Sequence, residues 1–366
     1  MKKGYFLLIA ALYAIAVFFL ASTTPITPHE AKIFYTSADL VAQLMKWGEG
    51  LIGGFLGLRI FFIFLGLISI LFFYEISRRS FAKREDAYLA TTIFMFLPGM
   101  ITGATLVSVA ILVLPLVLLF VLLYESKHFI FLPLIMLALF FIHDTSVIFF
   151  LALLVYGIVH KEKMISILSA AFLLAFIYFS RGIDVGGKPS GHFVEIFGLY
   201  AAVFSPFVFF YFFYTMYRIL LREKKTLLWY ISFTALVLSL LLSIRQRIDI
   251  ANFAPYVMIS VGLMLNTFHH SLRVRLPQFQ KRYILGFKLV MLTLLISAMA
   301  IFFHKVLVNQ MPEPKRYSAN NVYSPYFLSK SLKSLNVSCY DTSNDHERYQ
   351  LQYYGIVPCR TNFPLK

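Results

Sequence analysis

The first polar segment of the chain holds residues that could do chemistry. It follows the first hydrophobic run and reads STTPITPHEAKIFYTSADLVAQLMKWGEGL over residues 22–51. His29 supplies an imidazole and Glu30 a carboxylate, two of the groups that proteins use as general acids and bases. Burial beside lipid would raise the pKa of a carboxyl group and suit it to accept a proton at neutral pH. Apolar residues recur at helical spacing over residues 29–45, which predicts one helix lying along the membrane surface.

Arginines occur at three places within or just after hydrophobic runs. Arg59 interrupts the run GGFLGLRIFFIF, and Arg245 and Arg247 follow the run at residues 227–243. Arginine binds phosphate oxygens through a planar fork, so these three residues are candidates to hold a lipid phosphate. Alternatively, Arg59 extends to lipid headgroups, and Arg245 and Arg247 belong to an ordinary exposed loop.

Two further polar segments are expected at the same membrane face. His143 and Asp144 separate two apolar runs in FFIHDTSVIFF, where Asp144 either caps the following helix or has a functional role. Lys188 is a candidate substrate ligand in the glycine-rich segment 180–195, which is either a lid or a plain linker. This segment follows no strand, so it is not a phosphate-binding P-loop. No motif requires a cofactor, although a divalent metal is one option, with ligands drawn from His29, Glu30, His143, Asp144 and His192.

Membrane helices must position these residues. Of the 366 residues, 60% are hydrophobic and 40 are phenylalanine, and the mean hydropathy is +0.77. Runs of about 18 or more apolar residues predict membrane-spanning helices, because the bilayer offers no hydrogen-bond partner to unpaired backbone groups. We therefore predict an all-α polytopic membrane protein, and we interpret the N-terminal run as an uncleaved helix. The eleven expected spans lie near residues 5–21, 52–76, 86–103, 104–124, 128–142, 145–159, 164–180, 194–216, 227–243, 250–267 and 283–303.

The charge distribution predicts the orientation of these spans. The formal net charge is +16, which in a soluble protein would suggest nucleic acid as a partner. Here the basic residues gather in alternate short loops, at residues 2–3, 78–84, 218–225 and 273–282. Loops rich in Lys and Arg face the cytoplasm, so we expect no nucleic acid, a cytoplasmic N-terminus and an extracytoplasmic C-terminus. A bacterial inner membrane is the expected location.

The last part of the chain differs in composition from the rest. We expect a transmembrane domain over residues 1–304 and a small extracytoplasmic α/β lobe over residues 305–366, with helices in SPYFLSKSLKSL and RYQLQYYG and strands in NVSCYDT and IVPC. Cys339 and Cys359 both lie in this lobe, which favours a disulfide bond in an oxidising compartment over two free thiols.

The order of these features resembles the GT-C superfamily of membrane glycosyltransferases, and within it the protein O-mannosyltransferases and aminoarabinose transferases. His29-Glu30-Ala31, followed by Tyr35, stands where that family has an Asp-Glu-Ala-like motif. Further similarity lies in the segment Gly53 to Arg59, the turn Arg78-Arg79-Ser80-Phe81, the segment Arg245 to Pro255 and the segment Pro325 to Cys359. The chain departs from the family by having His29 in place of its first acid, and no acid in the turn TGATLVSV.

The resemblance implies an enzyme that takes a sugar from a polyprenyl-phosphate donor. The acceptor would be a glycan, lipid or protein at the outer face of the membrane. Glu30 would act as general base on an acceptor hydroxyl, while His29 or Asp144 would orient groups. Arg245 and Arg247, with Arg59, would neutralise charge on the leaving lipid phosphate, and His143 and Lys188 would contact substrate. Glu30, Arg245 and Arg247 would then share one cavity.

Two other functions stay open at this point. A lipid or solute transporter should show inverted repeats and broken helices near the middle of the membrane. The chain has no convincing internal repeat, and its polar residues are expected to gather at one face. A catalytically inactive scaffold in an envelope complex is the other alternative.

Overall fold

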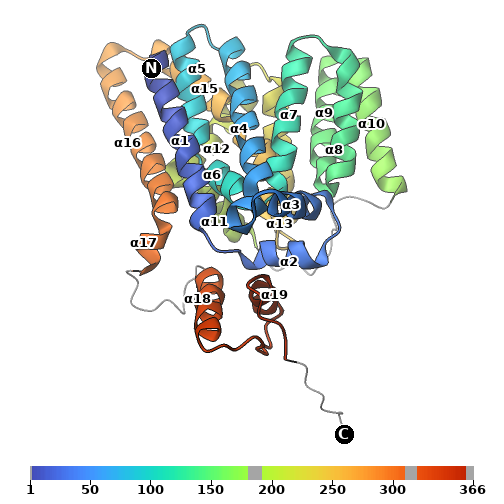
Figure 1. Ribbon diagram of the computed structural model, residues 1–366. Helices are drawn as coiled ribbons and strands as arrows, with labels where there is room; N and C mark the ends of the chain where they lie inside the picture. The colour runs from blue at the N-terminus through green and yellow to red at the C-terminus, as the bar shows by residue number, and fades with distance from the viewer. Residues whose placement is uncertain (1, 180–191, 310–319, 360–366) are drawn as a thin grey trace. The chain divides into compact units, whose positions relative to one another are not determined.

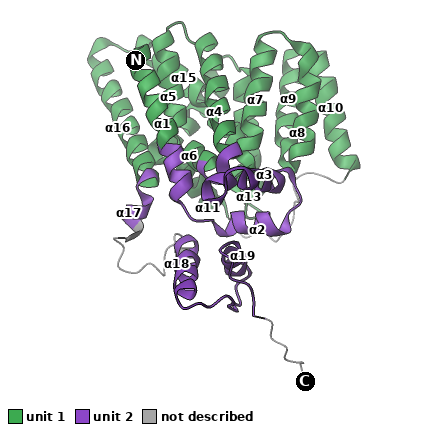
Figure 2. Cartoon of the chain, in the orientation of Figure 1, with its two compact units in different colours: residues 1–15, 62–104, 108–301 green, residues 16–61, 105–107, 302–366 purple. Residues whose placement is uncertain are grey.

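The computed structural model describes residues 2–179, 192–309 and 320–359, and helices dominate these residues (Figure 1). The chain forms two compact units (Figure 2). Unit 1 consists of Met1–Ile15, Phe62–Ala104 and Ser108–Ile301. Unit 2 consists of Ala16–Phe61, Thr105–Val107 and Phe302–Lys366. The predicted C-terminal lobe thus belongs to the same unit as the first polar segment.

Three described helices are long and apolar enough to cross a membrane. They are α1 (Lys3–Thr23), α4 (Gly54–Ser80) and α16 (Pro277–Phe302). Helices α1 and α4 run continuously from one unit into the other, and Arg78 and Arg79 in the last turn of α4 complement the negative end of its dipole. The expected spans 5–21, 52–76 and 283–303 correspond to these three helices.

Unit 1 contains the bundle of apolar helices in the upper part of Figure 1. Besides parts of α1, α4 and α16, its α-helices are α5 (Arg84–Met95), α6 (Pro98–Thr105), α7 (Val109–Glu125), α8 (Leu132–Ile142), α9 (Val147–His160), α10 (Lys163–Tyr178), α11 (Phe193–Phe204), α12 (Pro206–Arg222), α13 (Leu227–Ser243), α14 (Ala254–Met258) and α15 (Val261–Val274). Short 3-10 turns form at η1 (Phe129–Phe131), η2 (Asp144–Ser146) and η3 (Ile250–Asn252).

Three of the predicted spans are broken, and proline marks each break. The pair α5 and α6 bends by 60° just before Pro98, and the pair α11 and α12 bends by 107° just before Pro206. At the second bend Ser205 has a φ of 78°, a left-handed conformation that ends α11. The predicted span 250–267 is divided into η3, α14 and α15, and α14 has Pro255 in its first turn. Proline cannot donate the backbone hydrogen bond that would continue a helix.

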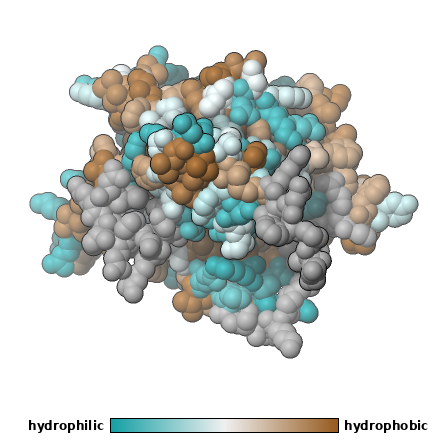
Figure 3. Space-filling view, turned by 60° about the horizontal axis from the view of Figure 1, so that its bottom comes forward, coloured by the Kyte–Doolittle hydropathy of each residue, from teal (hydrophilic) through white to brown (hydrophobic). Residues whose placement is uncertain are grey.

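By length and composition, the helices of the described residues do not confirm the eleven expected spans. The described residues contain three clear spans, or up to five if each bent pair counts as one. The remaining apolar helices are shorter than 18 residues and fall in the segments Val109–Glu125, Phe129–Ile142, Asp144–His160, Lys163–Tyr178 and Leu227–Ser243. The fold is that of an all-α integral membrane protein. Large apolar side chains remain exposed on many of these helices, and hydrophobic patches lie between hydrophilic ones on the surface in Figure 3.

Unit 2 contains two short helices in place of the single helix predicted over residues 29–45. Helix α2 (Pro28–Thr36) and helix α3 (Leu40–Ile52) are separated at residues 37–39, because the Asp39 side chain accepts the Ala42 amide and begins a new helix. The unit also holds α17 (His304–Asn309), α18 (Asn320–Ser334) and α19 (Asp345–Tyr353). Helix α18 includes all but the last residue of the predicted helix SPYFLSKSLKSL, and α19 overlaps the predicted RYQLQYYG helix.

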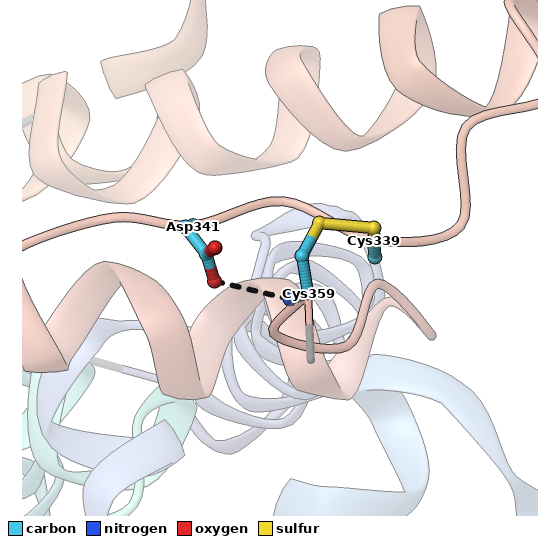
Figure 4. The surroundings of a disulfide bond; sticks show 3 residues. All are labelled: Cys339, Asp341 and Cys359. Carbon is cyan, nitrogen blue, oxygen red and sulfur yellow. Dashed lines mark hydrogen bonds between the residues drawn. A yellow bond between two sulfur atoms is a disulfide. The ribbon is translucent and has the colours of Figure 1, made fainter. Parts of the chain in front are cut away.

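The two strands predicted in the C-terminal lobe do not form. Among the described residues, Cys339 and Val357 make one isolated parallel β-bridge, so the lobe is helical rather than α/β. A disulfide bond joins Cys339 to Cys359, and the Cys359 amide donates to the Asp341 carboxylate at 3.0 Å (Figure 4). The disulfide closes the lobe with a sequence separation of 20 residues.

Two helices of unit 2 approach closely at a pair of glycines. A Cβ atom added at Gly48 of α3 would lie 2.2 Å from the carbonyl oxygen of Gly57 in α4. Gly53 and Gly54 join the two helices with φ values of 74° and 64°, a backbone that favours glycine. The sequence GEGLIGGFLG therefore allows the start of α4 to lie directly against α3.

We predict that Gly48→Ala destabilises the protein by about 1–3 kcal/mol, because the new methyl group must push the α4 backbone away. The matched control is Gly50→Ala in the same helix, where an added Cβ meets no atom within 4 Å. Alanine is the better helix former, so this control should be neutral or slightly stabilising. Thermal unfolding in detergent measures both variants, and equal melting temperatures would contradict the close approach.

Candidate active site

Glu30 is fully buried in unit 2, and both of its carboxylate oxygens are occupied. Oε1 accepts hydrogen bonds from Arg59 Nε at 2.8 Å and from the Val107 amide at 3.0 Å. Oε2 accepts from Arg59 Nη2 at 2.7 Å and from the Thr27 amide at 2.8 Å. A bidentate arginine and two backbone amides thus hold the carboxylate in one orientation.

The Arg59 side chain also uses all of its hydrogen-bond donors. Besides its two bonds to Glu30, Nη1 donates to the carbonyl oxygens of Ala21 and Thr24, at 2.9 and 2.7 Å, and Nη2 donates to that of Pro25 at 3.0 Å. These five contacts match the five N–H donors of a guanidinium group. The Ala21 carbonyl belongs to the last turn of α1, where a cation is favoured by the helix dipole. Arg59 therefore joins the end of α1 to the start of α2.

The local sequence explains why Glu30 has this geometry. Thr27 is the N-cap of α2, and its hydroxyl accepts the Glu30 amide at 3.2 Å while the Glu30 side chain accepts the Thr27 amide. This reciprocal pair is the capping box that the pattern Thr-x-x-Glu encodes, with Pro28 at the first helical position. The pattern was visible in the sequence, and it would have predicted a structural role for this carboxylate.

The expected raised pKa of Glu30 is wrong. Burial alone would raise it, but the charge and hydrogen bonds of Arg59, together with the Thr27 and Val107 amides, hold the pKa of Glu30 below its usual value. Glu30 is therefore ionised at neutral pH, and all four of its contacts are already used. A carboxylate in this state is poorly suited to take a proton from a substrate. In this structure the Glu30 carboxylate holds together the segments that donate to it.

Glu49 is an acid of unit 2 whose pKa is shifted in the opposite direction from that of Glu30. It lies on α3, half-buried, and burial raises its pKa although a hydrogen bond from the Tyr353 hydroxyl partly lowers it. Its negative charge also contributes to the raised pKa values of Tyr35 and Tyr353, after burial itself. Glu49 lies in the first polar segment, residues 22–51, but the sequence analysis did not select it. Only its packing against residues about 300 positions later in the chain distinguishes it from the other acids.

Tyr35 and Tyr353, which interact with this acid, belong to an aromatic cluster in unit 2. The Phe34 and Tyr353 ring centroids lie 6.0 Å apart, those of Tyr35 and Tyr349 lie 6.2 Å apart, and Phe55 contacts Tyr353 at 6.2 Å. Rings from α2, α4, α18 and α19 therefore meet here, the cluster comprising Phe34, Tyr35, Phe55, Tyr326, Tyr349, Tyr353 and Tyr354. Apolar walls with a few polar groups are typical of small-molecule sites.

The remaining predicted site residues are dispersed. In unit 1, Arg247 is highly exposed and forms an ion pair with Glu195 at 2.7 Å, and His192 lies 3.1 Å from the same carboxylate. Arg245 is exposed and engaged by a neighbour. A cavity of about 370 Å³ adjoins this group and is lined by Glu195, Leu199, Arg247, Ile248, Asp249 and Ile250. Because Glu30 belongs to unit 2, its sharing a cavity with Arg245 and Arg247 stays a prediction.

His143, rather than Asp144, caps the helical turn after it. Its Nδ1 accepts the Thr145 amide at 3.1 Å and lies 2.6 Å from the Thr145 hydroxyl. Asp144 is half-buried as the first residue of η2, and His29 is exposed on α2. Lys188 lies outside the described residues. No group of three or more His, Cys, Asp or Glu side chains within the described ranges could hold a metal ion.

Two solved structures match nearly the whole chain, and both are of ArnT from Cupriavidus metallidurans. The structure bound to undecaprenyl phosphate has a TM-score of 0.63 and 11% sequence identity, covering 98% of this chain and 86% of that one. The apo structure has a TM-score of 0.57 and 12% identity, covering 97% of this chain and 74% of that one. No family model and no curated protein sequence matches. The chain therefore has an ArnT-like fold, which confirms at the level of fold the resemblance seen in its sequence.

We predict that Glu30 and Arg59 are energetically coupled. Glu30→Leu and Arg59→Met should each destabilise the protein by about 3–5 kcal/mol, because each leaves a buried charge without its partner. The double variant should lose less than the sum of the two, with a coupling of about 1–3 kcal/mol. Additive losses would contradict the buried pair. The control is the exposed pair of Glu75 and Arg78, also 2.7 Å apart, whose removal should cost at most about 1 kcal/mol.

The pH dependence of these variants tests the ionised state. Since the folded-state pKa of Glu30 is lowered, its stabilisation is present above the unfolded-state value of about 4.3 and is lost as pH falls through the folded-state value. The stability advantage of the wild type over Glu30→Gln should therefore be constant near neutral pH and shrink below about pH 4. An advantage that grows as the pH falls would mean that Glu30 is protonated in the folded protein.

Proposed function

We propose that this protein is a membrane glycosyltransferase that moves a sugar from a polyprenyl-phosphate donor to an acceptor at the outer face of the membrane. The observation that supports this most is the ArnT-like fold of 98% of the chain, since the ArnT structure was determined with undecaprenyl phosphate bound. The acceptor class is a glycan, lipid or protein that offers a hydroxyl group. In this proposal a cell-envelope location and a bacterial inner membrane follow from the lipid carrier.

The topology that we propose is the one expected from the charges. Eleven spans, with the short apolar helices counted, would put the N-terminus in the cytoplasm and the C-terminus outside. The disulfide between Cys339 and Cys359 supports this, because disulfides persist in oxidising compartments such as the bacterial periplasm. The concentration of basic residues in alternate loops supports the same orientation.

Glu49 is our candidate for the general base. Transfer of a sugar to a hydroxyl requires a group that takes the hydroxyl proton while the phosphate leaves. A half-buried carboxyl group with a raised pKa suits that role, and the aromatic cluster beside it offers flat apolar surfaces to a sugar ring. The exposed His29, at the position of the family's first acid, is the second candidate, and Asp144 is the third.

Arg59 no longer fits as a phosphate ligand, because all of its donors are used inside unit 2. Arg245 and Arg247 remain our candidates to bind the lipid phosphate, with His143 and Lys188 as further substrate contacts. For Arg247 to contact a phosphate it must exchange its ion pair with Glu195. Charge at a leaving phosphate is stabilised by such guanidinium groups.

One observation favours an inactive scaffold as a second candidate. Position 29 is a histidine, whereas the family that this chain resembles has an acid there, and the adjacent Glu30 forms an ion pair with Arg59. A chain that keeps the fold of a transferase without its base would still bind a polyprenyl phosphate. Transport is the third candidate function, and the two bent helix pairs of unit 1 are the feature that would suit it.

We predict that Glu49→Gln lowers transfer by about 100-fold or more, as expected for loss of a general base. Purified protein in proteoliposomes would receive an undecaprenyl-phosphate-linked sugar and envelope lipid extract, and release of undecaprenyl phosphate would be followed by mass spectrometry. The matched control is Asp345→Asn, an exposed acid on α19 of the same unit, which should keep full activity.

Two outcomes would contradict the proposal. Full activity of Glu49→Gln together with loss in His29→Ala would move the base to His29. No turnover by the wild type, with binding of undecaprenyl phosphate retained, would favour the scaffold.

A further inference from the structure

An apolar cavity opens between four helices of unit 1. Its volume is about 270 Å³, and it lies among α5, α12, α15 and α16. The lining is Ile93, Val208, Tyr211, Val261, Met264, Leu265, Phe268, Arg282, Tyr283, Gly286, Phe287, Val290 and Met291. Gly286 leaves open space on the α16 side, because a Cβ atom added there would meet nothing within 4 Å. Such a cavity fits a hydrocarbon chain.

A basic pocket of about 460 Å³ lies at the ends of α12 and α15. It is lined by Tyr214, Tyr217, Arg218, Leu221, Arg222, Ser271, Val274 and Arg275. Three of these side chains are arginines and three carry hydroxyl groups, while no acid is among them. Guanidinium and hydroxyl groups together are donors suited to phosphate oxygens.

The two pockets are neighbours on the same helices. Tyr211 of the cavity and Tyr214 of the basic pocket are one turn apart on α12, as are Phe268 and Ser271 on α15. The hydroxyl groups of Tyr211 and Tyr283 lie 3.4 Å apart at the junction. The Arg275 guanidinium lies 4.2 Å from the centroid of the Tyr283 ring, so one tyrosine contacts both compartments.

Most of the positive charge in the basic pocket is not neutralised. Arg218 is engaged, since it pairs with Glu223 at 3.0 Å and also contacts Ser271 and His270. Arg222 and Arg275 are exposed, and among the described residues neither has an acidic side chain within ion-pair distance. Lys281 and Arg282 add further charge nearby in sequence. The pocket therefore offers two guanidinium groups to an anion.

We propose that the cavity and the basic pocket form one binding site for an anionic phospholipid. Its phosphate would contact Arg222 and Arg275, and an acyl chain would enter the cavity past Tyr211 and Tyr283. The adjoining apolar cavity is the reason to infer a lipid rather than free phosphate. Basic pockets between membrane helices on the cytoplasmic side bind anionic lipid headgroups, and residues 218–225 and 273–282 are two of the loops expected on that side. The site is separate in sequence and in unit from Glu30 and Glu49.

The headgroup test uses the full-length protein in detergent, titrated with phosphatidylglycerol and followed by native mass spectrometry. The double variant Arg222→Ala/Arg275→Ala should weaken binding by about tenfold or more. Arg273→Ala is the matched control, because this exposed arginine lies near the end of α15 but lines neither pocket. Phosphatidylcholine with the same chains should bind far more weakly than phosphatidylglycerol.

A second test concerns the acyl chain of the lipid and uses a larger side chain at the cavity. Gly286→Leu should reduce retention of phosphatidylglycerol, whereas Gly198→Leu, another exposed helical glycine with no atom within 4 Å of an added Cβ, should not. Equal binding of phosphatidylcholine, or unchanged binding in both the arginine and Gly286 variants, would overturn the proposal. Competition by inorganic phosphate as strong as by the lipid would reduce the site to a phosphate site, and preferred binding of undecaprenyl phosphate would assign it to the carrier lipid instead.

Discussion

The buried ion pair of Glu30 and Arg59 is the constraint on which unit 2 depends. Two charges removed from water are tolerated only when each finds partners of opposite charge or polarity. Glu30 lies in the first turn of α2 and Arg59 in the second turn of α4. The pair forms hydrogen bonds with the end of α1 and with Val107, which lies 77 positions from Glu30 in the chain. These segments cannot separate without leaving one of two buried charges unpaired. The pair thus fixes the geometry of the first polar segment more firmly than apolar packing alone would.

This constraint changes how the chemistry of the site should be understood. A carboxylate that completes a structural network and a carboxylate that exchanges a proton need opposite environments. Glu30 has the first, with donors on both oxygens and a lowered pKa, while Glu49 has the second, with partial burial and a raised pKa. Gln350 extends the network from the other end of the chain, since its amide donates to the Ile26 and Asn321 carbonyls at 2.9 and 3.1 Å. Helix α19, which carries Tyr353, is thereby fixed to the segment before α2.

Composition and charge predicted the membrane class, and a disulfide between the only two cysteines was the favoured pairing. The motif around Glu30 and the segment from Gly53 to Arg59 were both singled out, but their direct contact was not, because nothing local in a sequence shows which buried charge meets which. The predicted boundaries of the spans are wrong where proline interrupts an apolar run, as at Pro98 and Pro206. Hydropathy does not distinguish a straight helix from a bent one. The strands predicted around Cys339 and Val357 do not form, and these two described segments share only one isolated β-bridge.

Backbone amide hydrogen exchange tests the organising role of the ion pair most directly. The Thr27 and Val107 amides both donate to Glu30, although they are distant in the chain. In the wild-type protein both amides should exchange slowly, and in Glu30→Ala both should lose protection together. Continued protection of Val107 in the variant, with Thr27 alone exchanging faster, would contradict the convergence of these segments on one carboxylate.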